Sequence, residues 1–113
     1  MHAPHHWLAE MANAVWARAR RSDADAIDGP RAAAIVAALA RSDIRLHPLE
    51  PVLTFAFDIA SACAVTMYDA LYVATAERLD VPFVTADARL VEKLAGTPWA
   101  ARAVALRQLA DPA

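Results

Sequence analysis

The stretch Phe83-Val84-Thr85-Ala86-Asp87-Ala88-Arg89-Leu90 decides the fold class of this chain. It begins as a short apolar strand after Pro82 and continues as a helix, predicted from about Asp87 to Leu94 and ending at Gly96. Elsewhere in the chain, helical patterns also alternate with short apolar runs. Strands that alternate with helices indicate βα units and a parallel sheet, so we predict the α/β class.

The remaining elements follow from apolar periodicity and from the positions of proline. A helix with apolar residues at i, i+3, i+4 and i+7 spacing precedes a turn-rich break, and proline then opens the next helix. The predicted elements are helices from Trp7 to about Arg20, from Pro30 to about Arg41, from Pro51 to about Cys63 and from Thr66 or Tyr68 to Leu79, and strands at Ile44–His47 and Ala103–Leu106.

Length and composition predict one domain over residues 1–113, with a substantial core because 58% of the residues are hydrophobic. A net charge of −2 excludes a broadly basic surface for nucleic acid, so any such contact must be local. The densest basic cluster, Arg18, Arg20 and Arg21, could bind phosphates, although a solvated helix end also explains it.

The single cysteine, Cys63, lies in an apolar run and is predicted to be a small buried residue. No intrachain disulfide is possible, which favours a reducing cytoplasm. No apolar segment is long enough for a membrane span or has the form of a signal peptide. We therefore expect a cytoplasmic protein that is not embedded in a membrane.

Three acidic residues are candidates for chemistry, and each also has a structural explanation. Asp87 follows a predicted strand, at the edge of a parallel sheet where ligands bind, but aspartate is also a favoured helix N-cap. Asp69 lies in the first turn of an apolar helix, a capping-box position in which a carboxylate is partly buried. Glu10 lies at the border of the apolar stripe of the first helix and could instead be solvated.

If these acids converge, their repulsion requires a cation. Two carboxylates about 4 Å apart repel by roughly 4 kcal/mol at an effective dielectric constant near 20. Oxygen ligands without a well-placed cysteine or histidine favour Mg²⁺ or Mn²⁺ over zinc. Such an ion activates water and stabilises charge on a phosphodiester, which predicts hydrolysis of a nucleic acid.

The sequence resembles the PIN-domain ribonucleases, and most closely the VapC-type toxins of bacterial toxin–antitoxin pairs. The resemblance covers essentially the whole chain, and the Tyr-Asp-Ala helix and the Thr-Ala-Asp turn are its specific parts. The matching stretches are Ala3-Pro4 with Trp7–Ala14, Ile44–Leu49, Tyr68–Ala74 and Pro82–Asp87.

The resemblance implies a three-layer α/β/α sandwich with an acidic magnesium site that cleaves RNA. It also implies inhibition by a cognate antitoxin and frequent homodimerisation. Carried over by motif, Glu10, Asp69 and Asp87 would be the metal-site carboxylates. Asn13 would orient Glu10 or the substrate, and Thr85 would contact metal-bound water.

The chain departs from the family pattern at its beginning. Family members start with a strand that ends in an aspartate, followed by a helix, whereas this chain starts directly at Met1-His2-Ala3-Pro4. That strand is central in the family's sheet, so its loss would leave two neighbouring strands unpaired and remove one acid. We expect Met1 to be an internal position of a longer reading frame. A catalytically impaired remnant that binds an antitoxin or dimerises is the alternative function.

Overall fold

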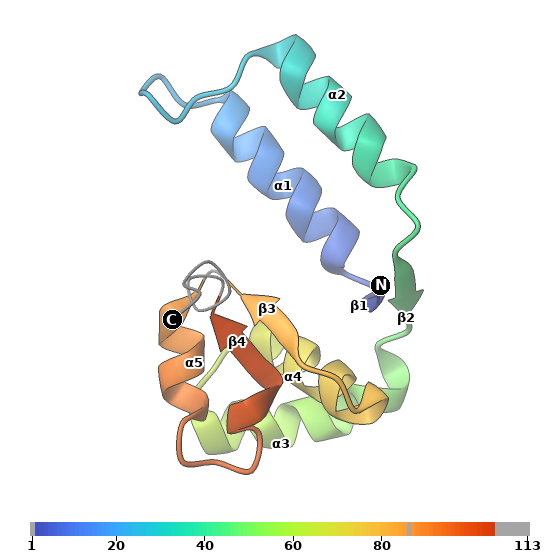
Figure 1. The fold of residues 1–113 in the computed structure, drawn as a ribbon, viewed down its shortest axis with the longest axis vertical. Helices are drawn as coiled ribbons and strands as arrows, with labels where there is room; N and C mark the ends of the chain where they lie inside the picture. The colour runs from blue at the N-terminus through green and yellow to red at the C-terminus, as the bar shows by residue number, and fades with distance from the viewer. Residues whose placement is uncertain (1, 86, 106–113) are drawn as a thin grey trace, which may run out of the picture. The chain divides into compact units, whose positions relative to one another are not determined.

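A computed structural model describes residues 2–85 and 87–105 of the chain (Figure 1). The chain divides into two compact units, Met1–His47 and Pro48–Ala113. Each unit contains helices and one two-stranded parallel sheet. The prediction of a mixed α/β chain with parallel strand pairing is therefore confirmed, while a single domain stays a prediction.

The first unit consists of two helices and two strands (Figure 1). The helices pack against each other, and the strands pair in parallel with Ala3 opposite Leu46. Its elements in chain order are β1 (His2–Pro4), α1 (Trp7–Ala19), α2 (Gly29–Ala40) and β2 (Arg45–His47).

Helix α2 begins where its sequence supplies an N-cap. The Asp28 carboxylate accepts a hydrogen bond from the Arg31 backbone N–H at 2.7 Å, and Pro30 lies in the first turn, where its missing N–H costs nothing. Asp28 is therefore the helix cap at the end of the turn that precedes α2. The predicted boundaries of α1, α2 and β2 agree with the structure to within one or two residues.

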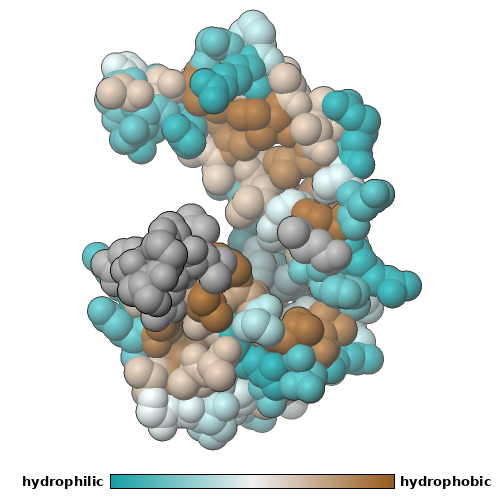
Figure 2. Space-filling view, in the orientation of Figure 1, coloured by the Kyte–Doolittle hydropathy of each residue, from teal (hydrophilic) through white to brown (hydrophobic). Residues whose placement is uncertain are grey.

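The first unit buries few of its side chains. Among its described residues only Ala3, Pro4 and Ala32 are buried, and no residue of α1 is. Apolar surface runs along the α1–α2 pair on the face shown in Figure 2. A chain segment of this size that buries so few side chains is only marginally stable by itself. The apolar surface of these two helices would be more stable if it were buried against another surface.

The second unit contains three α-helices, two short 3₁₀ turns and two strands. Strands β3 and β4 pair in parallel with Val84 opposite Val104, and α5 forms the connection between them. In chain order the elements are η1 (Glu50–Val52), α3 (Leu53–Cys63), α4 (Met67–Leu79), β3 (Phe83–Thr85), α5 (Ala88–Leu94), η2 (Ala100–Arg102) and β4 (Ala103–Ala105).

The core of the second unit forms around α3 and α4, which pack along each other. Ile59 of α3, Val73 of α4 and Leu94 of α5 are fully buried and are its largest such side chains. Cys63 is also buried, as predicted from its apolar neighbours. Alanines at 56, 70 and 74 are buried in this core, and their small side chains allow α3 and α4 to approach closely.

Helix α3 ends in a left-handed residue, Ala64, with φ of 55°. The Ala64 carbonyl accepts a hydrogen bond from the Lys93 ammonium group of α5 at 3.0 Å. This contact fixes the end of α3 against α5. It holds an L-residue in a conformation that glycine adopts without steric cost.

Replacing Ala64 with glycine is expected to raise the free energy of unfolding by about 1 kcal/mol, because it relieves the left-handed strain. Chemical denaturation monitored by circular dichroism measures this change. The matched control is Ala62→Gly in the last turn of the same helix, which should lower the free energy of unfolding by up to about 1 kcal/mol. Destabilisation by both variants would contradict the prediction.

Strand β1 was not predicted from the sequence. It is only three residues long, and it contains Pro4, which cannot donate to a sheet and suits an edge strand. Its strand conformation depends on pairing with β2, a partner more than 40 residues away. The residues of the 3₁₀ turn η1 were predicted as the first turn of α3, whereas the structure has them as a separate turn. The predicted final strand extended to Leu106, which lies outside the described residues.

Candidate metal and RNA site

Asp69 lies in the first turn of α4 and is half-buried, as its apolar neighbours predicted. Its backbone N–H donates to the Thr66 hydroxyl at 3.2 Å, so Thr66 is the N-cap of this helix. The α4 dipole places positive partial charge here and stabilises a carboxylate. The capping interpretation and a ligand role for the Asp69 carboxylate are thus compatible.

Asp87 is the N-cap of α5 and is exposed. Its carboxylate accepts hydrogen bonds from the backbone N–H groups of Arg89 at 2.9 Å and Leu90 at 3.4 Å. The Asp87 N–H in turn donates to the Thr85 hydroxyl at 3.0 Å. Asp87 is therefore a helix cap, which was the structural explanation offered for it from the sequence. Thr85 is linked to Asp87 because its hydroxyl accepts from the Asp87 backbone N–H.

Asp69 and Asp87 both belong to the second unit, Asp69 on α4 and Asp87 at the start of α5. The strand that precedes Asp87 lies beside α4, because Phe83 of β3 contacts Tyr72 of that helix with ring centroids 5.9 Å apart.

Glu10 belongs to the first unit, in the first turn of α1, and is half-buried. Its carboxylate lies 3.6 Å from the Nε2 atom of His6, one turn earlier. Asn13 is exposed on the same helix. Because Glu10 and the two aspartates belong to different units, their convergence stays a prediction.

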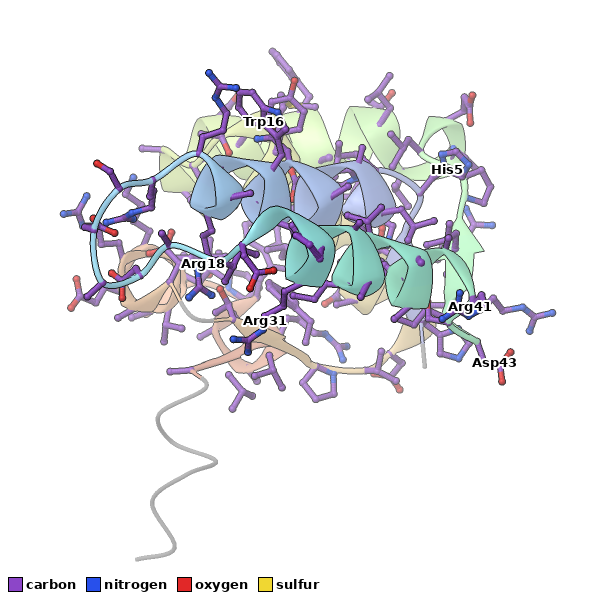
Figure 3. The ribbon with its side chains drawn as sticks, turned by 90° about the horizontal axis from the view of Figure 1, so that it is seen from above. His5, Trp16, Arg18, Arg31, Arg41 and Asp43 are labelled. Carbon is purple, nitrogen blue, oxygen red and sulfur yellow. The ribbon has the colours of Figure 1, made fainter. Side chains whose placement is uncertain are left out.

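The three arginines of the basic cluster each contact a neighbour in their own unit. Arg18 donates to the Asp25 carbonyl at 3.1 Å, and the Arg20 guanidinium lies 4.9 Å from the centroid of the Trp16 ring. Figure 3 shows Trp16 on the side of α1 that faces away from α2. Trp16 is exposed.

Arg21 forms an ion pair with Asp23, to which its Nε donates at 3.0 Å, and this sets a testable pH dependence. These bonds hold the pKa of the Asp23 carboxyl below its ordinary value of 3.8. A carboxyl whose pKa is lower in the folded chain contributes to the stability of the fold at pH values above its ordinary pKa. This stability is lost as the pH falls through the pKa of the folded state.

We expect Arg21→Gln to return the pKa of Asp23 toward 3.8, because the guanidinium donor is removed. The measurement is a pH titration of the carboxyl carbon of Asp23 by NMR. Arg41→Gln, an exposed arginine elsewhere in this unit, should leave the titration unchanged. An Asp23 titration curve that does not move in Arg21→Gln would contradict this explanation.

The sequence predictions missed a pair of histidines. His2 of β1 and His47 of β2 approach with Nδ1 of His2 2.9 Å from Nε2 of His47. Neither histidine was among the residues predicted to form a site. The signal that could have found the pair is the parallel register of β1 and β2, which places both side chains on one face.

The donor chemistry of Asp69 and Asp87 fits magnesium. Mg²⁺ binds oxygen ligands, keeps several waters, and needs only one or two carboxylates when substrate phosphates complete its coordination. Over residues 2–85 and 87–105, no group of three histidine, cysteine, aspartate or glutamate side chains could hold a metal ion.

Comparison with protein-family models finds no match, and no curated protein matches the chain significantly. In the part of the chain that the structure describes, no single helix is long and apolar enough to cross a membrane. Only the sharply bent pair Glu50–Cys63 and Met67–Leu79 passes such a test, and by length and composition alone.

Proposed function

We propose that this chain is a metal-dependent endoribonuclease of the PIN type, acting as the toxin of a toxin–antitoxin pair. The observation that carries the proposal is the placement of two carboxylates in the second unit. Asp69 is half-buried at the start of α4, and Asp87 directly follows the carboxyl end of β3. Parallel α/β folds bind ligands at this edge of the sheet.

The parallel pairing of the strands supports an α/β fold of the PIN type. The described strands form two separate parallel pairs, β1–β2 and β3–β4. Parallel strands that alternate with helices are the arrangement that an α/β/α sandwich requires.

In this proposal, the residues of the chain position the RNA phosphate and the ion. A bound Mg²⁺ or Mn²⁺ would supply an activated water and stabilise negative charge on the phosphodiester. Asp69 and Asp87 would bind the ion, and a ligand role for Glu10, which lies in the other unit, rests on the family resemblance alone. Thr85 restrains the Asp87 backbone by the hydrogen bond described above.

Four further residues, all in the first unit, have proposed roles. Asn13 would orient Glu10 or the substrate, from one turn further along α1. Arg18 and Arg20 extend from the other end of that helix, and with Arg21 they would contact RNA phosphates. An overall charge of −2 limits RNA binding to such local contacts, so affinity should fall as salt is added.

The test is a divalent-cation titration of RNA cleavage by the untagged chain. Metal-stripped protein should leave a labelled RNA intact, cleave it when Mg²⁺ or Mn²⁺ is added, and stop when EDTA is added. Manganese should also raise the melting temperature, because it binds only the folded chain. Binding of manganese without cleavage would contradict the enzyme and support an impaired remnant. No shift in melting temperature would contradict the metal site itself.

A second candidate function, an interaction module, is favoured by exposed apolar side chains. Phe57 and Leu53 lie one turn apart on α3 and are 62% and 49% exposed. Trp16 on α1 is 58% exposed. Large apolar side chains at adjacent surface positions are typical of protein–protein contacts. The partner would be a second copy of the chain or the cognate antitoxin.

Sedimentation velocity over a range of concentrations tests the homodimer. Wild-type protein should sediment as a dimer, and Phe57→Ser should shift it to monomer while leaving circular dichroism unchanged. Thr54→Ser, an exposed polar change on the same helix, is the control. A monomeric wild type at all concentrations would contradict the homodimer and leave the antitoxin as the partner to test by co-purification.

A further inference from the structure

His2 and His47, two potential metal ligands of the first unit, approach each other closely. The two rings are held on neighbouring strands, with centroids 5.0 Å apart and Nδ1 of His2 2.9 Å from Nε2 of His47. In this register His2 lies opposite Arg45, and His47 lies opposite Pro4. The two histidines are therefore diagonal neighbours on one face of the β1–β2 pair.

This arrangement brings together two imidazole nitrogens that are 45 residues apart in sequence. A nitrogen–nitrogen hydrogen bond at this distance requires one imidazole to donate and the other to accept. A metal ion between the two rings would bind both nitrogens, in place of the hydrogen bond that they share. Imidazole is the protein ligand that suits copper, nickel and zinc.

The nitrogen–nitrogen distance indicates which metal geometry fits. With metal–nitrogen bonds of about 2.0–2.1 Å, two nitrogens 2.9 Å apart subtend an angle of roughly 90° at the metal. That angle is found between neighbouring ligands in square-planar or octahedral sites, whereas a tetrahedral zinc site needs a wider one. We propose that His2 Nδ1 and His47 Nε2 bind one divalent transition metal of the square-planar or octahedral class, with Cu²⁺ preferred over Ni²⁺.

The site requires only small local changes. Both binding nitrogens must present lone pairs. In the ring that donates the hydrogen bond, the proton therefore moves to the other nitrogen, while the accepting ring already carries its proton there. The His2 side chain is exposed and can rotate about its second side-chain torsion, which has a broad energy minimum. Water would fill the other coordination positions. Arg45 lies opposite His2 and weakens binding by charge repulsion, so this is a site of moderate affinity.

This site is distinct in chemistry from the acidic site of the proposed nuclease. Its donors are nitrogens of the first unit, whereas Asp69 and Asp87 supply oxygens in the second. Copper and nickel favour the former, and magnesium the latter. Because both ligands come from paired strands, binding would also tie β1 to β2 and stabilise the folded first unit.

Copper binding to the full chain tests the proposal. The protein should be untagged and carry a short N-terminal extension, because a free terminal amine chelates copper together with a histidine at the second position. We expect one Cu²⁺ per chain, with two nitrogen ligands in the electron paramagnetic resonance spectrum. His47→Gln should weaken binding at least about tenfold. In known sites the loss of a residue that only orients a metal ligand already costs about that much, and His47 is itself a proposed ligand.

Four further measurements make the outcome decisive. His2→Gln should weaken binding as much as His47→Gln, His5→Gln should leave it unchanged, and Arg45→Gln should strengthen it. In the wild type, Cu²⁺ should broaden the NMR signals of His2 and His47 before those of other histidines, a readout that does not depend on the folding of any variant. Equal affinity in wild type and His47→Gln, or equal loss in His5→Gln, would overturn the proposal.

Discussion

Replacing Asp69 with asparagine is expected to reduce divalent-cation-dependent RNA cleavage by at least about 100-fold, because it removes a proposed metal ligand. The side chain keeps its size, and the Asp69 backbone N–H that donates to Thr66 is retained. The helix cap therefore survives in this variant. Single-turnover cleavage of a labelled RNA at saturating Mn²⁺ measures the effect.

Two variants separate a metal role for Asp69 from the loss of charge or of the cap. Asp58→Asn removes an exposed carboxylate from α3 in the same unit and should cleave like wild type. Thr66→Val removes the N-cap of α4 and should lower stability by about 1 kcal/mol without changing the metal dependence. Equal cleavage by wild type and Asp69→Asn would show that the Asp69 carboxylate is structural.

Replacing Ile59 with alanine is expected to lower the free energy of unfolding of the second unit by about 2–5 kcal/mol. Ile59 of α3 is fully buried in the core of the second unit, and the substitution leaves a cavity there. Because whole domains are stable by only about 5–15 kcal/mol, this loss would unfold a measurable fraction of the chains. Urea denaturation monitored by circular dichroism measures it.

Leu53→Ala is the matched control for Ile59→Ala. It removes the same number of carbon atoms from the same helix, but Leu53 is 49% exposed. We expect a loss below about 1 kcal/mol for an exposed site. Equal losses for the two variants would mean that the exposed face of α3 is covered in solution, and would thereby favour a dimer.

Local signals in the sequence were sufficient to predict most of the helices. Asp28, Thr66 and Asp87 each precede a helix and each cap it in the structure. Capping depends on residues within three positions of one another, so it can be inferred without knowledge of the tertiary fold. The strand at residues 83–85 was predicted for a similar reason, because it lies between a proline and a cap.

Features that depend on distant partners were not predictable in the same way. Strand β1 exists because it pairs with β2, and the approach of His2 to His47 follows from that pairing. Three-residue strands carry too little periodicity to be identified alone. The proposed acidic site has the same limitation, since the spacing of Asp69 and Asp87 in sequence does not fix the distance between their carboxylates.

Arg102 joins the last part of the chain to the end of α4. Its guanidinium donates to Glu77 at 2.7 Å and to Asp80 at 2.8 Å, and the hydrogen bonds to Asp80 and Glu77 raise the pKa of Arg102. Without Arg102, both acids would repel the negative pole of the α4 dipole. Arg102 directly precedes β4, so the pairing of β4 with β3 is coupled to neutralisation of that pole. High ionic strength screens the ion pairs of Arg102 and should therefore loosen β4 before the helices.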